Sequence, residues 1–86
     1  MDSLHSMTVA RLRLFAQARE AAGTADATVP DGTVEEILSG AGDLYGEGFA
    51  AVVAVSRVWV NGSPATGSTA VGPGDEVAVL PPVSGG

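Results

Sequence analysis

The 86-residue sequence contains no cysteine and no lysine. Without cysteine the chain has no disulfide, no thiolate metal ligand and no thiol nucleophile. Its cationic side chains are four arginines, against ten acidic residues, for a formal net charge of -6. Because nucleic-acid binding needs clustered cations that displace phosphate counterions, this composition argues against DNA, RNA and anionic membranes as partners. A partner with a basic surface is more compatible with it.

Long apolar runs and an export signal are missing as well. No window approaches the roughly 20 apolar residues that cross a bilayer, and residues 1–7 lack the basic segment and apolar run of a secretory signal. We therefore expect a cytoplasmic protein. A chain of 86 residues makes one small domain, so function is expected on its surface or at a chain end. The 45% of hydrophobic residues indicates a folded core.

Alternation of apolar and polar residues predicts half-buried strands. In the first strand, Arg11 and Arg13 alternate with Leu12, so the arginines lie on one side and the leucine on the other. Turn residues mark the strand ends, with an Asn-Gly pair at 61–62 and a Pro-Gly pair at 73–74. The predicted strands are residues 8–15, 25–29, 53–60 and 75–80.

Two segments have the features of helices. Residues 16–22 are rich in alanine and are followed by a glycine, which suits the left-handed turn after a helix. Thr33 and Glu36 have the spacing of a capping box, so a main helix begins at Val34. Its glycine-rich continuation, residues 39–52, fits either one broken helix or two short ones. This order of elements predicts an α+β fold, with the main helix packed on one face of a small mixed sheet.

The last residues of the sequence, Pro-Pro-Val-Ser-Gly-Gly, are its most informative part. The two prolines remove two N–H donors, so the final strand cannot pair beyond Leu80. The two glycines have no Cβ, so they can pass a narrow channel and bring a terminal carboxylate to another protein. We therefore expect a flexible extension over 1–6, a folded domain over 7–80 and an extended arm over 81–86. A frayed, inert end is the alternative interpretation of the arm.

Residues 14–23 and 74–86, with the Val-Asn-Gly turn at 60–62, resemble the small subunit of molybdopterin synthase, the sulfur-carrier family called MoaD. The resemblance implies a ubiquitin-like β-grasp fold. It also implies that an E1-like adenylyltransferase activates the carboxylate of Gly86 with ATP and Mg²⁺, and that sulfur from a donor then displaces AMP. The resulting thiocarboxylate gives its sulfur to cyclic pyranopterin monophosphate. In this scheme the chain itself binds no cofactor and no metal.

The resemblance also implies a larger partner. An acidic chain offers few groups that bind a phosphorylated pterin, so the catalytic groups are expected mainly on the large subunit of molybdopterin synthase. Strand alternation places Trp59 and Leu80 on the wet side of their strands, and with Phe15 they form a predicted apolar partner-binding cluster. For Phe15 a place in the core is an equally good interpretation. The arm residues expected to enter the partner's pocket ahead of Gly86 are Pro81, Pro82, Ser84 and Gly85.

Three other functions remain open at this stage. The chain fits a sulfur carrier for another product, such as the thiazole of thiamin or an amino acid. It also fits a ubiquitin-like modifier that is joined to lysines of other proteins, although its own lack of lysine prevents lysine-linked chains of itself. The third alternative is an interaction module with an inert end. The Pro-Pro-Val-Ser-Gly-Gly run and residues 15–20 favour molybdopterin.

Overall fold

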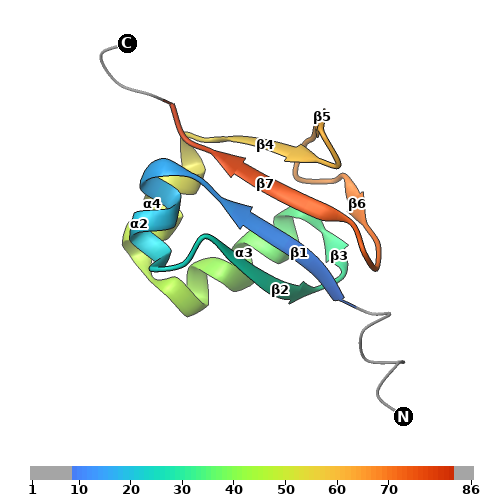
Figure 1. The fold of residues 1–86 in the computed structure, drawn as a ribbon, viewed down its shortest axis with the longest axis horizontal. Helices are drawn as coiled ribbons and strands as arrows, with labels where there is room; N and C mark the ends of the chain where they lie inside the picture. Colours follow the sequence, from blue (N-terminus) through green and yellow to red (C-terminus); the bar gives the residue numbers. More distant parts are fainter. Residues whose placement is uncertain (1–8, 83–86) are drawn as a thin grey trace.

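The computed structural model describes residues 9–82, so the predicted extension over 1–6 lies outside the described residues. The elements in chain order are β1 Val9–Leu14, α2 Ala16–Ala22, β2 Asp26–Pro30, β3 Gly32–Thr33, α3 Val34–Tyr45, α4 Glu47–Ala54, β4 Arg57–Val60, β5 Ser63–Pro64, β6 Ala70–Val71 and β7 Glu76–Leu80. Five of the described strands form one sheet in the order β2-β1-β7-β4-β5, and β3 pairs with β6 (Figure 1).

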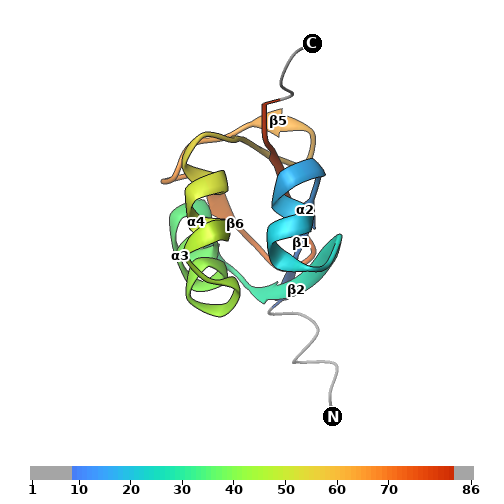
Figure 2. The ribbon, with the colours of Figure 1, turned by 90° about the vertical axis from the view of Figure 1, so that its left-hand side faces the viewer.

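The first and last strands of the large sheet lie side by side at its centre. β1 and β7 run parallel, while β2 pairs antiparallel with β1 and β4 pairs antiparallel with β7. Helices α3 and α4 lie behind this sheet, and α2 follows β1 at the end of the core (Figures 1 and 2). The predicted α+β class is confirmed, and parallel pairing of the first and last strands is the arrangement of a β-grasp fold.

The core lies between the sheet and the helices. Alternate residues of the two central strands point into it, and Leu12, Val77 and Val79 are fully buried. Burial of each such side chain contributes about 1.5–3 kcal/mol, so these strands carry much of the stability. Among residues 9–82 no polar or charged residue is buried. The buried hydrophobic residues are Ala10, Leu12, Leu14, Ala18, Val34, Ile37, Ala41, Phe49, Val71, Val77 and Val79.

The predicted helix boundaries at α2 and at the start of α3 are confirmed. Helix α2 ends at Gly23, whose φ of 78° is left-handed. The capping box is present, because Thr33 Oγ1 accepts from the Glu36 N–H at 3.2 Å and Glu36 Oε1 accepts from the Thr33 N–H at 3.0 Å. These bonds satisfy N–H groups that the first turn leaves without helical partners. None of the helices in residues 9–82 has the length and hydropathy to span a bilayer.

The strand predicted over residues 53–60 is wrong in its first half. Residues up to Ala54 belong to α4, and the strand begins at Arg57. Phe49 is fully buried, and Val52 and Val53 pack partly buried against the core. This is the i, i+3, i+4 spacing of a helix, and it outweighs the strand preference of valine.

The glycine-rich continuation of the main helix forms two helices rather than one broken helix. Gly46 separates α3 from α4, with a φ of 102° that disfavours other residues. The two helices pack closely, since a Cβ on Gly42 would lie 3.6 Å from the Cβ of Ala50. An alanine at position 42 would therefore make an ordinary van der Waals contact with Ala50.

Candidate functional site

The sheet face opposite α3 and α4 carries the residues predicted to bind a partner, and we call it the outward face. Its membership follows from the register, because residues directly opposite each other in neighbouring strands point to the same side. Trp59 of β4 lies opposite Ala78 of β7, and Arg13 of β1 pairs with the same alanine. The outward face comprises Arg11, Arg13, Phe15, Arg57, Trp59, Glu76, Ala78 and Leu80.

Phe15 belongs to this face and does not fill the core. Its backbone is extended, so its side chain points away from that of Leu14, which is 2% exposed. The Phe15 side chain is 38% exposed, and the guanidinium carbon of Arg13 lies 5.5 Å from the centre of its ring. The N–H of Phe15 donates to the carbonyl of Val79 at 3.3 Å, which holds residue 15 beside the end of β7.

The three apolar residues of the predicted cluster therefore lie on one face. Leu80 ends the central strand β7, Phe15 follows β1 on one side of it, and Trp59 lies in β4 on the other. All three side chains retain access to solvent. Exposed aromatic and aliphatic side chains on an open sheet face are typical anchors of a protein interface.

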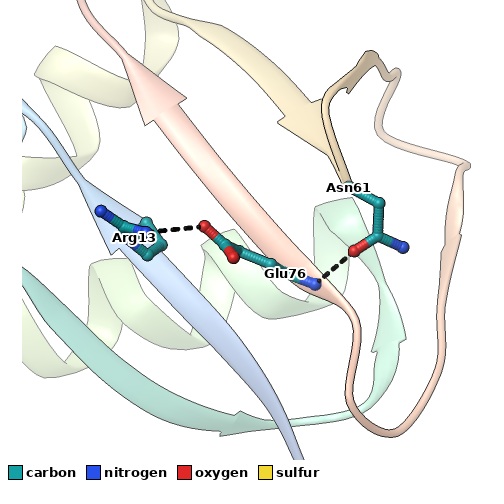
Figure 3. A network of polar contacts seen from close by, with 3 residues as sticks. All are labelled: Arg13, Asn61 and Glu76. Carbon is teal, nitrogen blue, oxygen red and sulfur yellow. Dashed lines mark hydrogen bonds and ion pairs between the residues drawn. The ribbon is translucent and has the colours of Figure 1, made fainter.

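A small polar network supports this face near the start of β7 (Figure 3). Arg13 Nη1 lies 3.2 Å from Glu76 Oε2, and both side chains are about two-fifths exposed. Asn61 Oδ1 accepts from the Glu76 N–H at 3.0 Å, and Asn61 Nδ2 donates to Asp75 Oδ1 at 3.0 Å. The network connects β1, β7 and the turn between β4 and β5. It was not predicted from the sequence, because Arg13 and Glu76 are 63 residues apart and meet only through the β1–β7 register.

The adjacent carboxylates of Asp75 and Glu76 have different partners, since Glu76 pairs with Arg13 and Asp75 accepts from Asn61 and from the turn backbone. The Gly72 N–H donates to Asp75 Oδ2 at 2.9 Å. This bond, together with the one from Asn61, lowers the pKa of Asp75 below its ordinary value. The carboxylate closes the turn over residues 72–75, in which Gly74 has a φ of 83°.

Within residues 9–82 no group of three or more His, Cys, Asp or Glu residues is placed to hold a metal ion.

The arm begins where β7 ends. Pro81 is buried and Pro82 is exposed, and neither belongs to a strand. This agrees with the prediction that pairing stops at Leu80. Ser84, Gly85 and Gly86 lie outside the described residues, so their roles stay a prediction.

Comparisons with known proteins agree with the fold and with the family resemblance. A sequence model of the ThiS family matches residues 12–86. The crystal structure of SAMP1 from Haloferax volcanii is similar, with 32% identity, coverage of 91% of this chain and 99% of that one, and a TM-score of 0.74. A protein from Pyrococcus furiosus provisionally named molybdopterin converting factor, subunit 1, has 25% identity, coverage of 88% and 99%, and a TM-score of 0.75.

A further solved structure shares the fold alone. It is the complex of subunits 1 and 2 of molybdopterin-converting factor from Helicobacter pylori 26695, whose matching chain is 20% identical at a TM-score of 0.66. The match covers 91% of this chain and 99% of that one. No curated protein matches the sequence significantly.

Proposed function

Because the chain belongs to the ThiS family of ubiquitin-like sulfur carriers, we propose that it carries sulfur as a thiocarboxylate at Gly86 and delivers it during molybdopterin synthesis. The chain is the sulfur-donating small subunit in this proposal, and it is not an enzyme on its own. The acceptor of the sulfur is cyclic pyranopterin monophosphate.

The proposed chemistry requires activation, because a carboxylate is a poor electrophile. An oxygen of the Gly86 carboxylate attacks the α-phosphorus of ATP and releases pyrophosphate, which leaves an acyl adenylate. Hydrosulfide from a donor then attacks the acyl carbon, AMP leaves with the electron pair of the broken C–O bond, and loss of the S–H proton leaves the thiocarboxylate. An E1-like adenylyltransferase supplies the ATP and Mg²⁺ site. The donor must supply the sulfur, because this chain has no cysteine to hold a persulfide.

One observation carries the proposal, namely the position of the apolar cluster at the root of the arm. The chain leaves the sheet after Leu80, the last residue of β7. On one side of β7 lies β4, which carries Trp59, and on the other side lies β1, which Phe15 follows. A partner that binds the outward face therefore lies where residues 81–86 begin. The arm is short and ends in two residues without side chains, so a pocket close to that interface is the place it reaches.

The nature of the partner follows from the charge and from the solved relatives. On β1, β4 and β7 the outward face carries one carboxylate, that of Glu76, which pairs with Arg13 at the end of β7 opposite to the arm. No lysine, histidine or cysteine lies within the described residues. We therefore expect the general acids and bases near the arm to come from the partner. The fold neighbour from Helicobacter pylori is a complex of subunit 1 with subunit 2 of molybdopterin-converting factor. We infer a comparable large subunit as the partner of this chain.

The second candidate function is protein modification. It is favoured by the similarity to SAMP1, small archaeal modifier protein 1, whose sequence identity of 32% is the highest of the three relatives described above. A modifier uses the same activated Gly86 but transfers the acyl group to a lysine amine of a target protein. A sulfur carrier and a protein modifier share this fold and this arm. They differ in the acceptor, which is the pterin precursor for the first and a lysine amine for the second.

Intact-mass measurement on protein purified from its own host tests the proposal first. We expect a C-terminal species that is heavier by the exchange of one oxygen for sulfur. Mixing that species with a large subunit and the pterin precursor should give molybdopterin. Absence of molybdopterin in this mixture contradicts the product assignment, and conjugates on target lysines would support the modifier function instead.

Substitution at the chain end gives the matched genetic test. Gly86→Ala adds one methyl group next to the reacting carbonyl, and we expect it to reduce thiocarboxylate formation strongly because the channel is sized for glycine. Gly40→Ala adds the same methyl group on α3, where a Cβ meets nothing within 4 Å. Full sulfur loading of both variants would contradict the proposed passage of the arm.

A further inference from the structure

A second surface lies on the other side of the molecule from the apolar cluster. Strand β2 and helix α3 line an open groove of about 450 Å³, which we call the β2–α3 groove. Its walls are mostly apolar, and Leu44 at its side is 74% exposed. Strand β1 separates it from β7 and from the arm. The apolar lining residues are Ala27, Val29, Pro30, Ile37, Ala41 and Leu44.

Strand β2 is also an edge of the sheet. Its only strand neighbour among residues 9–82 is β1, so the backbone groups on its other side have no strand partner there (Figure 1). An edge of this kind can accept an additional extended chain through main-chain hydrogen bonds. The side chains of Ala27 and Val29 lie on the core side of β2, because they pair with Leu12 and Ala10 of β1. An added strand would therefore place alternate side chains over the groove.

The charge around the groove has one sign. Asp31 and Glu36 line it, and Asp43 lies on the same helix as Glu36. Asp26 of β2 pairs with Arg13 and therefore points to the same side of the sheet as the outward face. Arg11 and Arg13 of the neighbouring strand β1 point to the outward face, and neither lines the groove. Residues 20–56 contain no arginine, lysine or histidine, and they hold seven of the ten acidic residues of the chain: Glu20, Asp26, Asp31, Glu35, Glu36, Asp43 and Glu47.

We propose that the β2–α3 groove binds an extended segment of a partner protein in which alternating apolar side chains are flanked by lysine or arginine. The backbone of this segment pairs with β2, its apolar side chains fill the groove, and its cations face the acidic rim. Charge complementarity selects this occupant over an acidic or uncharged strand. The surface is separate from the outward face, so a partner bound here leaves the arm free for another protein. The proposal does not depend on the sulfur chemistry.

Nuclear magnetic resonance of the full ¹⁵N-labelled chain tests the proposal. The probe is a synthetic peptide, Lys-Lys-Val-Thr-Val-Thr-Val-Lys-Lys, and the comparison peptide carries glutamate in place of each lysine. We expect amide shift changes within β2 and α3 on addition of the lysine peptide, weaker binding at high salt, and no saturable change with the glutamate peptide.

A glycine on α3 allows the groove to be filled without unfolding the helix. Gly40 lines the groove, and a Cβ added there meets nothing within 4 Å. We expect Gly40→Gln to bind the lysine peptide about tenfold more weakly or worse, because the new side chain occupies the space of the peptide. Gly48→Gln is the matched control, since Gly48 is also helical and unobstructed but does not line the groove. It should bind as the unsubstituted chain does, and circular dichroism checks that both variants are folded.

Each other outcome overturns the proposal. Shift changes on the outward face, equal affinity for the glutamate peptide, unchanged affinity of Gly40→Gln, or no binding at millimolar peptide each contradict it. Groove shifts that depend on protein concentration without peptide would identify a second copy of the chain as the occupant. Groove shifts on removal of residues 1–7 would identify the chain's own beginning.

Discussion

Asn61 joins the turn after β4 to the start of β7 with both ends of its amide. Its oxygen accepts from the Glu76 N–H and its nitrogen donates to the Asp75 carboxylate, each at 3.0 Å. Its φ of 51° is left-handed, a conformation that asparagine tolerates better than most residues. Asparagine therefore suits position 61 in two ways, because it tolerates the left-handed backbone and its amide makes both hydrogen bonds.

Replacing Asn61 should separate these two contributions. We expect Asn61→Ala to lower the free energy of unfolding by about 1–2 kcal/mol, from lost hydrogen bonds and from a left-handed alanine. Asn61→Gly loses the same bonds without the conformational penalty, so its loss should be smaller. Urea unfolding of the three proteins measures both effects. Equal stability of the two variants would show that the backbone conformation contributes nothing.

Asp75 should give the domain a component of acid sensitivity. Its pKa is lowered in the folded state by the Gly72 N–H and by Asn61, so the folded chain binds this proton less readily than the unfolded chain. The stabilisation is therefore present above the ordinary pKa of 3.8 and is lost as the pH falls through the lower folded pKa. Asp75→Asn should flatten the acid side of the stability–pH curve. Parallel curves for the two proteins, measured by urea unfolding, would contradict this.

At the scale of elements, the predictable parts are those whose pattern is local. The β1 strand, helix α2 and the start of α3 follow from alternation, from an alanine-rich run before Gly23, and from the capping box of Thr33. Helix α4 was expected only as one of two alternatives for residues 39–52, and its last two residues were assigned to the following strand because valines favour strands. The helical spacing of Phe49, Val52 and Val53 was the signal that could have identified it, and only burial against the core shows that this spacing prevails.

Two glycines should respond in opposite directions to the same substitution. Gly23 ends α2 with a φ of 78°, so Gly23→Ala should destabilise the protein by about 1 kcal/mol. Gly40 lies inside α3 with open space at its Cβ, so Gly40→Ala should stabilise by about 0.5–1 kcal/mol. Thermal unfolding followed by circular dichroism compares them. A shift of both melting temperatures in one direction would contradict the assigned backbone roles.

At the scale of the whole molecule, the sheet has two faces with different roles. Residues on its inner face form the core and stabilise the fold, and residues on its outward face are available to partners. Alternation alone predicted that Trp59 and Leu80 face outward, because the period of a strand is two residues. The pattern could not predict which strands are neighbours. The β1–β7 pairing therefore decides that Phe15 lies beside the end of β7, and packing between β2 and α3 decides where the second groove lies.

Substitutions on the two faces of β4 and β7 test this division. Leu80→Ala and Trp59→Ala should weaken binding of a large subunit with little change in stability, since both side chains lie on the outward face. Val79→Ala should lower the free energy of unfolding by about 1–3 kcal/mol, because Val79 is fully buried. Calorimetric titration and urea unfolding give the two quantities. A loss of stability in Trp59→Ala as large as its loss of binding would contradict the interface role.

The central position of β7 has a consequence for protein synthesis. The ribosome makes this strand last among the described elements, yet β1 and β4 have no common neighbour until it is in place. A nascent or prematurely terminated chain therefore leaves the sheet split into two halves with Leu12 and Leu14 uncovered on one side. Only a chain translated through β7 can close its core, so we expect incomplete copies to stay open to proteases that degrade unfolded chains.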